Sequence, residues 1–149
     1  IIIQHVKNGL RLADKYQLPS VIKGFISTHH GQSLAQYFYV SYKNAFPDKE
    51  IDKRLFTYPG PNPTTLEQAI LMMADSIEAA SRSLSEYTEE SLNNMVDRII
   101  DDQITGGYFA QCPISFLEIA EAKDVFKTKL RTMYHTRIQY PELTRGDKN

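Results

Sequence analysis

Two adjacent histidines, His29 and His30, are the residues of this sequence whose type and spacing most readily suggest chemistry. They follow an amphipathic stretch and come directly before Gly31. Neutral imidazole is the commonest metal ligand in proteins, so we interpret the pair as half of a metal site. An alternative is that one imidazole only interacts with the negative C-terminal end of a helix.

Two further residues are candidates for the same site. Asp75 follows the apolar run 69–74, and His5 lies one helix earlier, beside an apolar stripe. A carboxylate among apolar neighbours is costly to desolvate unless a cation or a hydrogen-bond donor meets it, and a metal ion or Arg82 could meet Asp75. Judged from spacing alone, a lone histidine such as His5 on an amphipathic helix is more often a surface or capping residue than a ligand. We hypothesise that His5, Asp75 and the histidine pair converge.

The elements that must position these residues are helices. Apolar residues recur at steps of three and four along most of the chain, and no strand pattern or internal repeat is present. Thr64 to Glu67 and Ser115 to Glu118 each match a capping box. The pattern predicts an all-α bundle of five or six helices around one core, with helices at about 2–16, 19–30, 33–46, 64–84, 88–105 and 115–138.

Two neighbouring segments, an aromatic helix and a proline-rich loop, could either pack or border a site. The predicted helix 33–46 is aromatic enough to line a pocket as well as a core. The segment 47–63 contains a dense run of prolines, which predicts a stiff, extended loop. Such a loop suits either a plain connector between helix pairs or the rim of a site.

Composition limits the classes of protein to consider. With 149 residues and a formal net charge of -1, the chain fits one domain and has no general attraction to DNA or RNA. The single cysteine, Cys112, predicts a reducing, cytosolic setting without disulfides. No apolar run is long enough to span a bilayer. The start at Ile1 without methionine suggests an internal piece of a longer protein.

Four short stretches together carry a family resemblance. They are HVKNG at 5–9, HHG at 29–31, YPGP at 58–61 and ADSIEAASR at 74–82. Their order and combination resemble the later part of an HD-superfamily phosphohydrolase domain. More narrowly, they are similar to the HD domain of the seven-transmembrane HD receptors, a group that includes cyclic di-AMP phosphodiesterases. The resemblance covers residues 1–141, and we predict a flexible tail at 142–149.

The resemblance implies a site that holds two divalent transition metal ions, iron or manganese. It gives ligand roles to His5, His29, His30 and Asp75, and a catalytic role to Asp75. The family's earlier histidine and its His-Asp dipeptide would lie before Ile1, so the domain is N-terminally incomplete. Four ligands are fewer than the about six that two ions need, which leaves open whether the chain alone is metal-loaded or active.

The resemblance implies hydrolysis of a cyclic dinucleotide, first of all cyclic di-AMP, by metal-activated water in the cytoplasmic domain of an integral membrane protein. The expected partner besides the substrate is a second copy of the protein, in a homodimer. The alternatives are a phosphohydrolase acting on another nucleotide, or an incomplete HD module that binds nucleotide or a partner for signalling. Arg82 is a candidate for gripping a phosphate, or for a salt bridge to Glu78. Tyr58, or an aromatic such as Tyr37, is a candidate for stacking on adenine, or for core packing.

Overall fold

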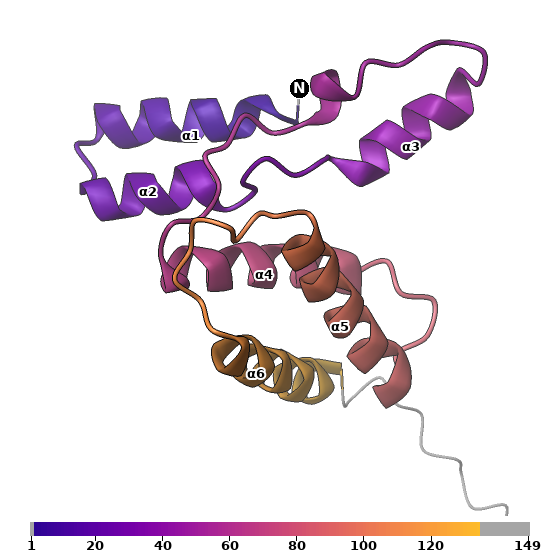
Figure 1. Cartoon of the computed structure of the whole chain (residues 1–149). Coiled ribbons are helices and arrows are strands. Elements are labelled where there is room, and N and C mark those ends of the chain that lie inside the picture. The colour runs from indigo at the N-terminus through magenta and orange to yellow at the C-terminus, as the bar shows by residue number, and fades with distance from the viewer. Residues whose placement is uncertain (1, 135–149) are drawn as a thin grey trace, which may run out of the picture.

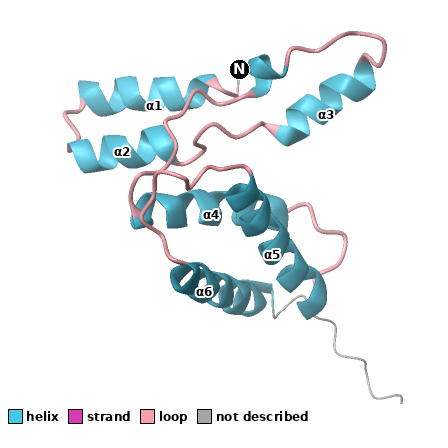
Figure 2. Cartoon of the chain, viewed as in Figure 1, coloured by secondary structure: helices cyan, strands magenta, loops and turns pink. Residues whose placement is uncertain are grey.

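The structure, a computed structural model, describes residues 2–134. Within this range the chain forms α-helices and one short 3₁₀-helix (η1), with a single isolated β-bridge between Leu34 and Thr57, which confirms the all-α prediction (Figures 1 and 2). The elements are α1 (Gln4–Lys15), α2 (Ser20–Thr28), α3 (Gln36–Ala45), η1 (Lys53–Phe56), α4 (Leu66–Ser81), α5 (Glu89–Thr105) and α6 (Phe116–Tyr134). No described helix is long and apolar enough to cross a membrane. The predicted tail 142–149 lies outside the described residues.

The first two helices form an antiparallel hairpin (Figure 1). α1 ends at Lys15, because Gln17 adopts a positive φ of 53° and Pro19 then serves as the N-cap of α2. Val6 and Ala13 are the buried residues of α1, and the polar side chains between them face outward. His5 therefore lies at the start of α1, next to a buried position.

The hydrophobic core lies among α4, α5 and α6. Its buried residues have at most 9% of their surface exposed, and they are Ala69, Met72, Met73, Ile77, Leu92, Met95, Val96, Ile100, Phe109, Ile119, Ala122, Leu130 and Tyr134. α2 packs against α4, so the hairpin lies on the side of α4 away from α5 and α6 (Figure 1). Asp75 is thereby carried on a helix that the core holds in place.

The predicted helix 33–46 does not join this core. α3 has no buried residue and contacts η1, and Tyr37 and Phe38 on it are 75% and 43% exposed. The apolar pattern correctly indicates a helix, but it does not determine which surface would cover it. The expectation of a core or pocket role for this helix is therefore not met among the described residues.

The helix caps agree with the sequence, with one shift of register. At α4 the N-cap is Thr65, whose hydroxyl accepts from the Gln68 amide, while the Gln68 side chain accepts from Thr64. The predicted box one residue earlier was wrong, because the second of two adjacent threonines takes the cap position. At α6 the predicted pair forms: Ser115 N donates to the Glu118 carboxylate at 2.7 Å and Glu118 N donates to Ser115 Oγ at 3.2 Å.

Candidate metal centre

The turn after α2 aims both adjacent histidines in one direction. α2 ends at Thr28, two residues earlier than predicted, with His29 as its C-cap and Gly31 at a positive φ of 50°. Successive side chains on a helix would diverge by about 100°, but these two residues lie beyond the helix. Their ring centroids are 4.1 Å apart with planes 39° from parallel. The two rings therefore lie against each other and can serve one site.

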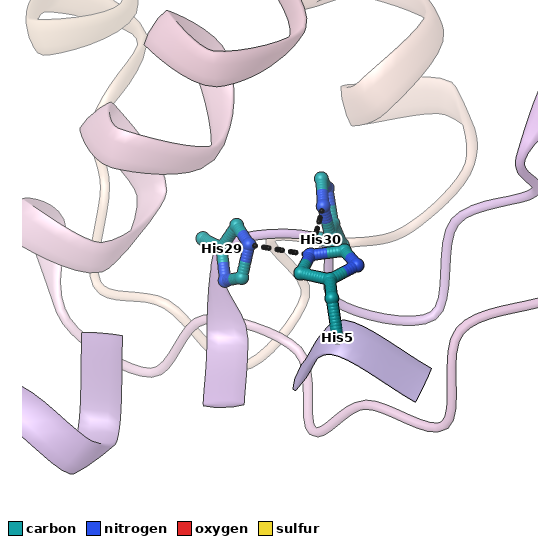
Figure 3. Close-up of side chains that lie close together, drawn as sticks. All are labelled: His5, His29 and His30. Carbon is teal, nitrogen blue, oxygen red and sulfur yellow. Dashed lines mark hydrogen bonds between the residues drawn. The ribbon is translucent and has the colours of Figure 1, made fainter. Parts of the chain in front are cut away.

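His5 reaches the same place from the start of α1. Its Nε2 lies 3.3 Å from His29 Nε2 and 3.1 Å from His30 Nε2 (Figure 3). One nitrogen from each of the three imidazoles lies within 4.8 Å of the other two. The structure thus brings together three residues that are separated by up to 25 positions in the chain.

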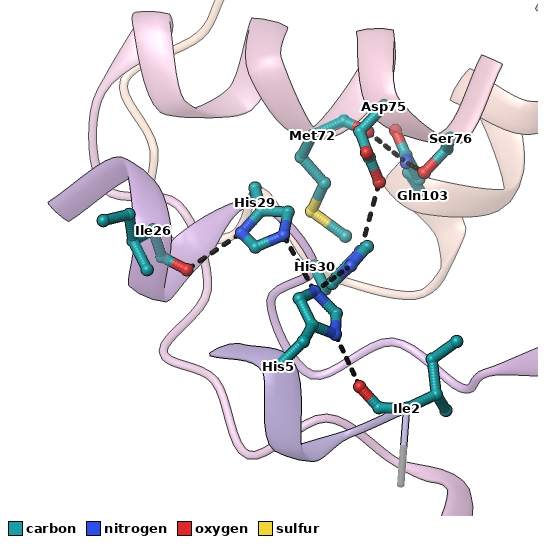
Figure 4. Close-up of polar contacts among 9 residues, drawn as sticks. All are labelled: Ile2, His5, Ile26, His29, His30, Met72, Asp75, Ser76 and Gln103. Atoms are coloured by element: carbon teal, nitrogen blue, oxygen red, sulfur yellow. Dashed lines mark hydrogen bonds and ion pairs between the residues drawn. The ribbon is translucent and has the colours of Figure 1, made fainter. Parts of the chain in front are cut away.

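Backbone carbonyls fix where the protons of two of these rings lie. His5 Nδ1 donates to the carbonyl of Ile2, and His29 Nδ1 donates to the carbonyl of Ile26 at 2.8 Å (Figure 4). A carbonyl oxygen only accepts, so in each neutral ring the proton is on Nδ1. The Nε2 atoms therefore present lone pairs, and these lone pairs face each other.

Asp75 fixes the proton of the third ring, that of His30, on Nδ1. His30 Nδ1 lies 3.2 Å from Asp75 Oδ2, and the side chain of Asp75 is 40% exposed (Figure 4). A carboxylate oxygen accepts from the Nδ1 proton, which leaves the lone pair of neutral His30 on Nε2, towards His5. Asp75 thus finds its partner in an imidazole, and Arg82 does not meet it in any contact of the described residues.

Charge and burial favour an ionised Asp75 and a neutral His29. The hydrogen bond from His30, together with the three nearby imidazoles, holds the pKa of Asp75 below its usual range despite burial. Partial burial, followed by the charge of His30, lowers the pKa of His29. Asp75 is therefore ionised and His29 neutral at pH 7.

The cluster fits a divalent metal ion. In the neutral rings three Nε2 lone pairs face one another, an arrangement that a cation between them would stabilise. Nitrogens held at about 2.1 Å from one ion in tetrahedral or octahedral geometry are about 3.0–3.4 Å apart, and His5 Nε2 lies 3.3 Å from His29 Nε2 and 3.1 Å from His30 Nε2. Imidazole donors suit zinc, copper, iron and nickel, while carboxylates add manganese to the range.

The two substrate-binding candidates lie in different surroundings. Tyr58 is buried, with 7% of its surface exposed, and its ring stacks on His30 with centroids 4.2 Å apart. Burial and the charge of Asp75 raise the pKa of the Tyr58 phenol. Arg82, at the C-cap of α4, has a 73% exposed side chain that forms an ion pair with Glu78. Thus Tyr58 lies against the histidines, whereas Arg82 forms the salt bridge to Glu78 that the sequence offered as its alternative role.

Sequence reasoning missed the residue that ties the loop to the histidine turn. Asn62 Oδ1 accepts from Gln32 N at 2.8 Å, and Asn62 Nδ2 donates to Gln32 Oε1 at 3.2 Å. This double contact fixes the turn that contains His30 and Gly31 against the loop that contains Tyr58. The proline-rich loop is therefore part of the rim of the site, and its prolines were the available signal.

Replacement of Gly31 by alanine is expected to distort this turn. A Cβ at Gly31 would lie 2.6 Å from Asn62 Oδ1, and the positive φ adds backbone strain. We expect a loss of about 1–3 kcal/mol in the free energy of unfolding, measured by chemical denaturation. Gly107→Ala is the matched control, because its φ of 75° carries the same backbone strain while its Cβ would meet nothing within 4 Å. Equal losses in the two variants would show that Asn62 does not constrain the turn.

Comparison with known proteins places this site in context. No protein-family model matches the chain. It is 36% identical over 148 residues to the cyclic-di-AMP phosphodiesterase PgpH of Bacillus subtilis, and 40% identical over 143 residues to the PgpH of Listeria monocytogenes. These alignments cover 99% and 95% of this chain, which spans about 20% of the length of either relative.

Solved structures agree with the sequence relatives. The HD domain of L. monocytogenes PgpH in complex with cyclic-di-AMP matches with a TM-score of 0.82 and 37% identity, over 93% of this chain and 64% of that one. The same domain, described without that nucleotide, matches with a TM-score of 0.80 and 34% identity, over 90% of this chain and 62% of that one. The chain is therefore homologous to the PgpH phosphodiesterases and corresponds to part of their HD domain.

Proposed function

We propose that this chain supplies part of the metal centre of a cyclic dinucleotide phosphodiesterase that acts on cyclic di-AMP. One observation carries the proposal: one nitrogen from each of three imidazoles lies within 4.8 Å of the other two, and the partners of the Nδ1 atoms leave the Nε2 lone pairs facing the space between them. Two homologues are named as cyclic-di-AMP phosphodiesterases, and one solved HD domain holds cyclic-di-AMP, which supports this substrate class.

In this proposal His5, His29 and His30 hold one divalent transition metal ion, iron or manganese. Asp75 acts beside them in two ways. It holds the Nδ1 proton of His30, which keeps Nε2 directed inward, and it leaves a second carboxylate oxygen that no hydrogen bond occupies among the described residues. That oxygen is the proposed ligand for a second ion, whose other ligands would come from the rest of the HD domain. Such ions, when bound, lower the pKa of water and neutralise charge on phosphodiester oxygens.

The protein's own groups would prepare this chemistry. The carbonyls of Ile2 and Ile26 and the carboxylate of Asp75 each hold one Nδ1 proton, so no imidazole has to turn or lose a proton when a cation binds. This preorganisation limits the free-energy cost of assembling the site. We also propose that the parent protein is anchored in a membrane, with this domain on the cytoplasmic side, and that it acts as a homodimer.

We also propose that Arg82 contacts a phosphate oxygen of the substrate. Its guanidinium is exposed and its ion pair with Glu78 is on the surface, where such pairs contribute little stability. The pair can therefore exchange for a phosphate at low cost. Arg82→Ala is expected to raise KM about tenfold and to leave metal affinity unchanged, with Glu78→Gln as the control. Equal losses of metal affinity and substrate affinity would assign Arg82 a structural role.

The decisive experiment compares two polypeptides: this chain, and a longer one with the complete HD domain. Each is titrated with Mn²⁺ and Fe²⁺ and assayed with cyclic di-AMP, cyclic di-GMP and a linear dinucleotide, with a chelator control. We expect both polypeptides to bind metal, and the longer one to hydrolyse cyclic di-AMP only with metal present. The proposal would be overturned if neither polypeptide bound metal. Nucleotide binding without turnover by the loaded, complete domain would favour the signalling module instead.

A further inference from the structure

Tyr58 makes ring contacts with two of the three histidines. Its plane lies 23° from that of His30 at a centroid distance of 4.2 Å, and it meets the ring of His5 edge-on, at 82° and 5.8 Å. The exposed fraction of Tyr58 is only 7%. The side chain therefore belongs to the packing of the histidine cluster.

The backbone around Tyr58 is anchored to the same turn that carries His30. Tyr58 N donates to the carbonyl of Ser33 at 2.9 Å, and Ser33 N donates to the carbonyl of His30 at 3.1 Å. A few residues further along the loop, the Asn62 side chain forms hydrogen bonds with both the backbone N–H and the side chain of Gln32. The tyrosine ring and the imidazole are thus fixed to one backbone unit, so their stacking is not a chance contact of two mobile side chains.

The hydrogen bond to Asp75 does not fix the plane of His30 by itself. The imidazole turns only about its Cα–Cβ and Cβ–Cγ bonds, and a single hydrogen bond from Nδ1 to Asp75 Oδ2 tolerates a range of ring tilts that would redirect Nε2 relative to His5. A flat aromatic surface stacked on one face of the ring opposes a change of this tilt. Asp75 and Tyr58 therefore restrict different motions of the same side chain.

We propose that Tyr58 is a positioning residue, which holds the imidazole of His30 in the plane that directs its Nε2 to the shared point of the three histidines. This inference rests on the proposed metal centre and adds a role to it. It differs from stacking on adenine, because one face of the tyrosine ring is occupied by His30 and little of the side chain is exposed. The ring carries this role, and the hydroxyl is not needed for it.

The test uses Tyr58→Phe and Tyr58→Leu in this chain, with metal affinity measured by Mn²⁺ and Co²⁺ titration. Phenylalanine keeps the flat ring, so we expect an affinity within about twofold of the wild type. Leucine keeps apolar bulk but loses the flat face, and loss of such a supporting contact typically costs about 10–100-fold in metal affinity. Wild-type affinity in the leucine variant, or an equal loss in both variants, would overturn the inference. If the leucine variant does not fold, Tyr58→Met, which also lacks a flat ring, takes its place with the same expected loss.

A metal-free readout separates this inference from the proposed function. The protons of the His30 ring are shielded by the tyrosine ring above them, so their NMR resonances are expected upfield in wild type and in Tyr58→Phe, and shifted downfield in Tyr58→Leu. The resonances of His29, which has no ring contact with Tyr58 among the described residues, serve as the internal control. A wild-type chain that binds no metal would overturn the metal centre, whereas unchanged His30 resonances in Tyr58→Leu would overturn the role of Tyr58.

Discussion

Replacement of His30 by alanine is expected to abolish metal-dependent hydrolysis in the complete domain and to reduce metal affinity of this chain at least 100-fold. The change removes one of three inward nitrogens and also leaves the Asp75 carboxylate without the donor that holds its pKa low. Helical content should be retained, because His30 lies in a turn outside the buried core. Metal titration, a hydrolysis assay and circular dichroism measure the three quantities.

Two companion variants sharpen this result. Asp75→Asn keeps an amide oxygen that can accept the hydrogen bond from His30 Nδ1, but it removes the charge. We therefore expect its metal affinity to lie between that of wild type and that of His30→Ala. Ser27→Ala is the neutral control, since the Ser27 hydroxyl bonds only the Gly24 carbonyl within the same helix. Near wild-type metal affinity in His30→Ala would count decisively against the assigned centre.

Saturating metal is expected to stabilise the folded chain substantially. A ligand that binds only the folded state at 100 times its dissociation constant adds about 2.7 kcal/mol, which corresponds to a rise on the order of 10 °C in Tm for a domain of this size. Thermal unfolding with Mn²⁺ and with a chelator measures the difference. The rise should disappear in His30→Ala.

Calcium supplies the control for this experiment. It prefers six to eight oxygen ligands, which three imidazoles do not offer, so Ca²⁺ should leave Tm unchanged. An equal rise with Ca²⁺, or a rise that persists in His30→Ala, would place the stabilising ion elsewhere in the molecule.

The helices could be predicted from sequence because their signals are local. Apolar steps of three and four, Pro19 and the Ser115 cap fix where helices begin and end to within a few residues. The position of α3 could not be predicted in the same way. Its aromatic pattern indicates an apolar face, but the partner of that face depends on residues far away in the chain.

The candidate site was predictable in its members but not in its geometry. The motif around Asp75 and the His29 and His30 pair stand out in sequence, whereas spacing alone gives His5 little weight. The stacking of Tyr58 on His30 joins a loop to a turn, and no local pattern encodes such a contact. The family resemblance supplied the identities of the residues, and the fold supplied the directions of their lone pairs.

The histidines and Asp75 lie in two different parts of the fold, and this affects how the protein unfolds. His5, His29 and His30 belong to the α1–α2 hairpin, while Asp75 belongs to the helices that share the main core. With one cysteine, the chain cannot form an internal disulfide between these parts. The imidazole–carboxylate contact therefore adds a noncovalent connection to the packing of α2 on α4, and amide hydrogen exchange in the hairpin is expected to be faster than in α4 to α6 when this contact is broken.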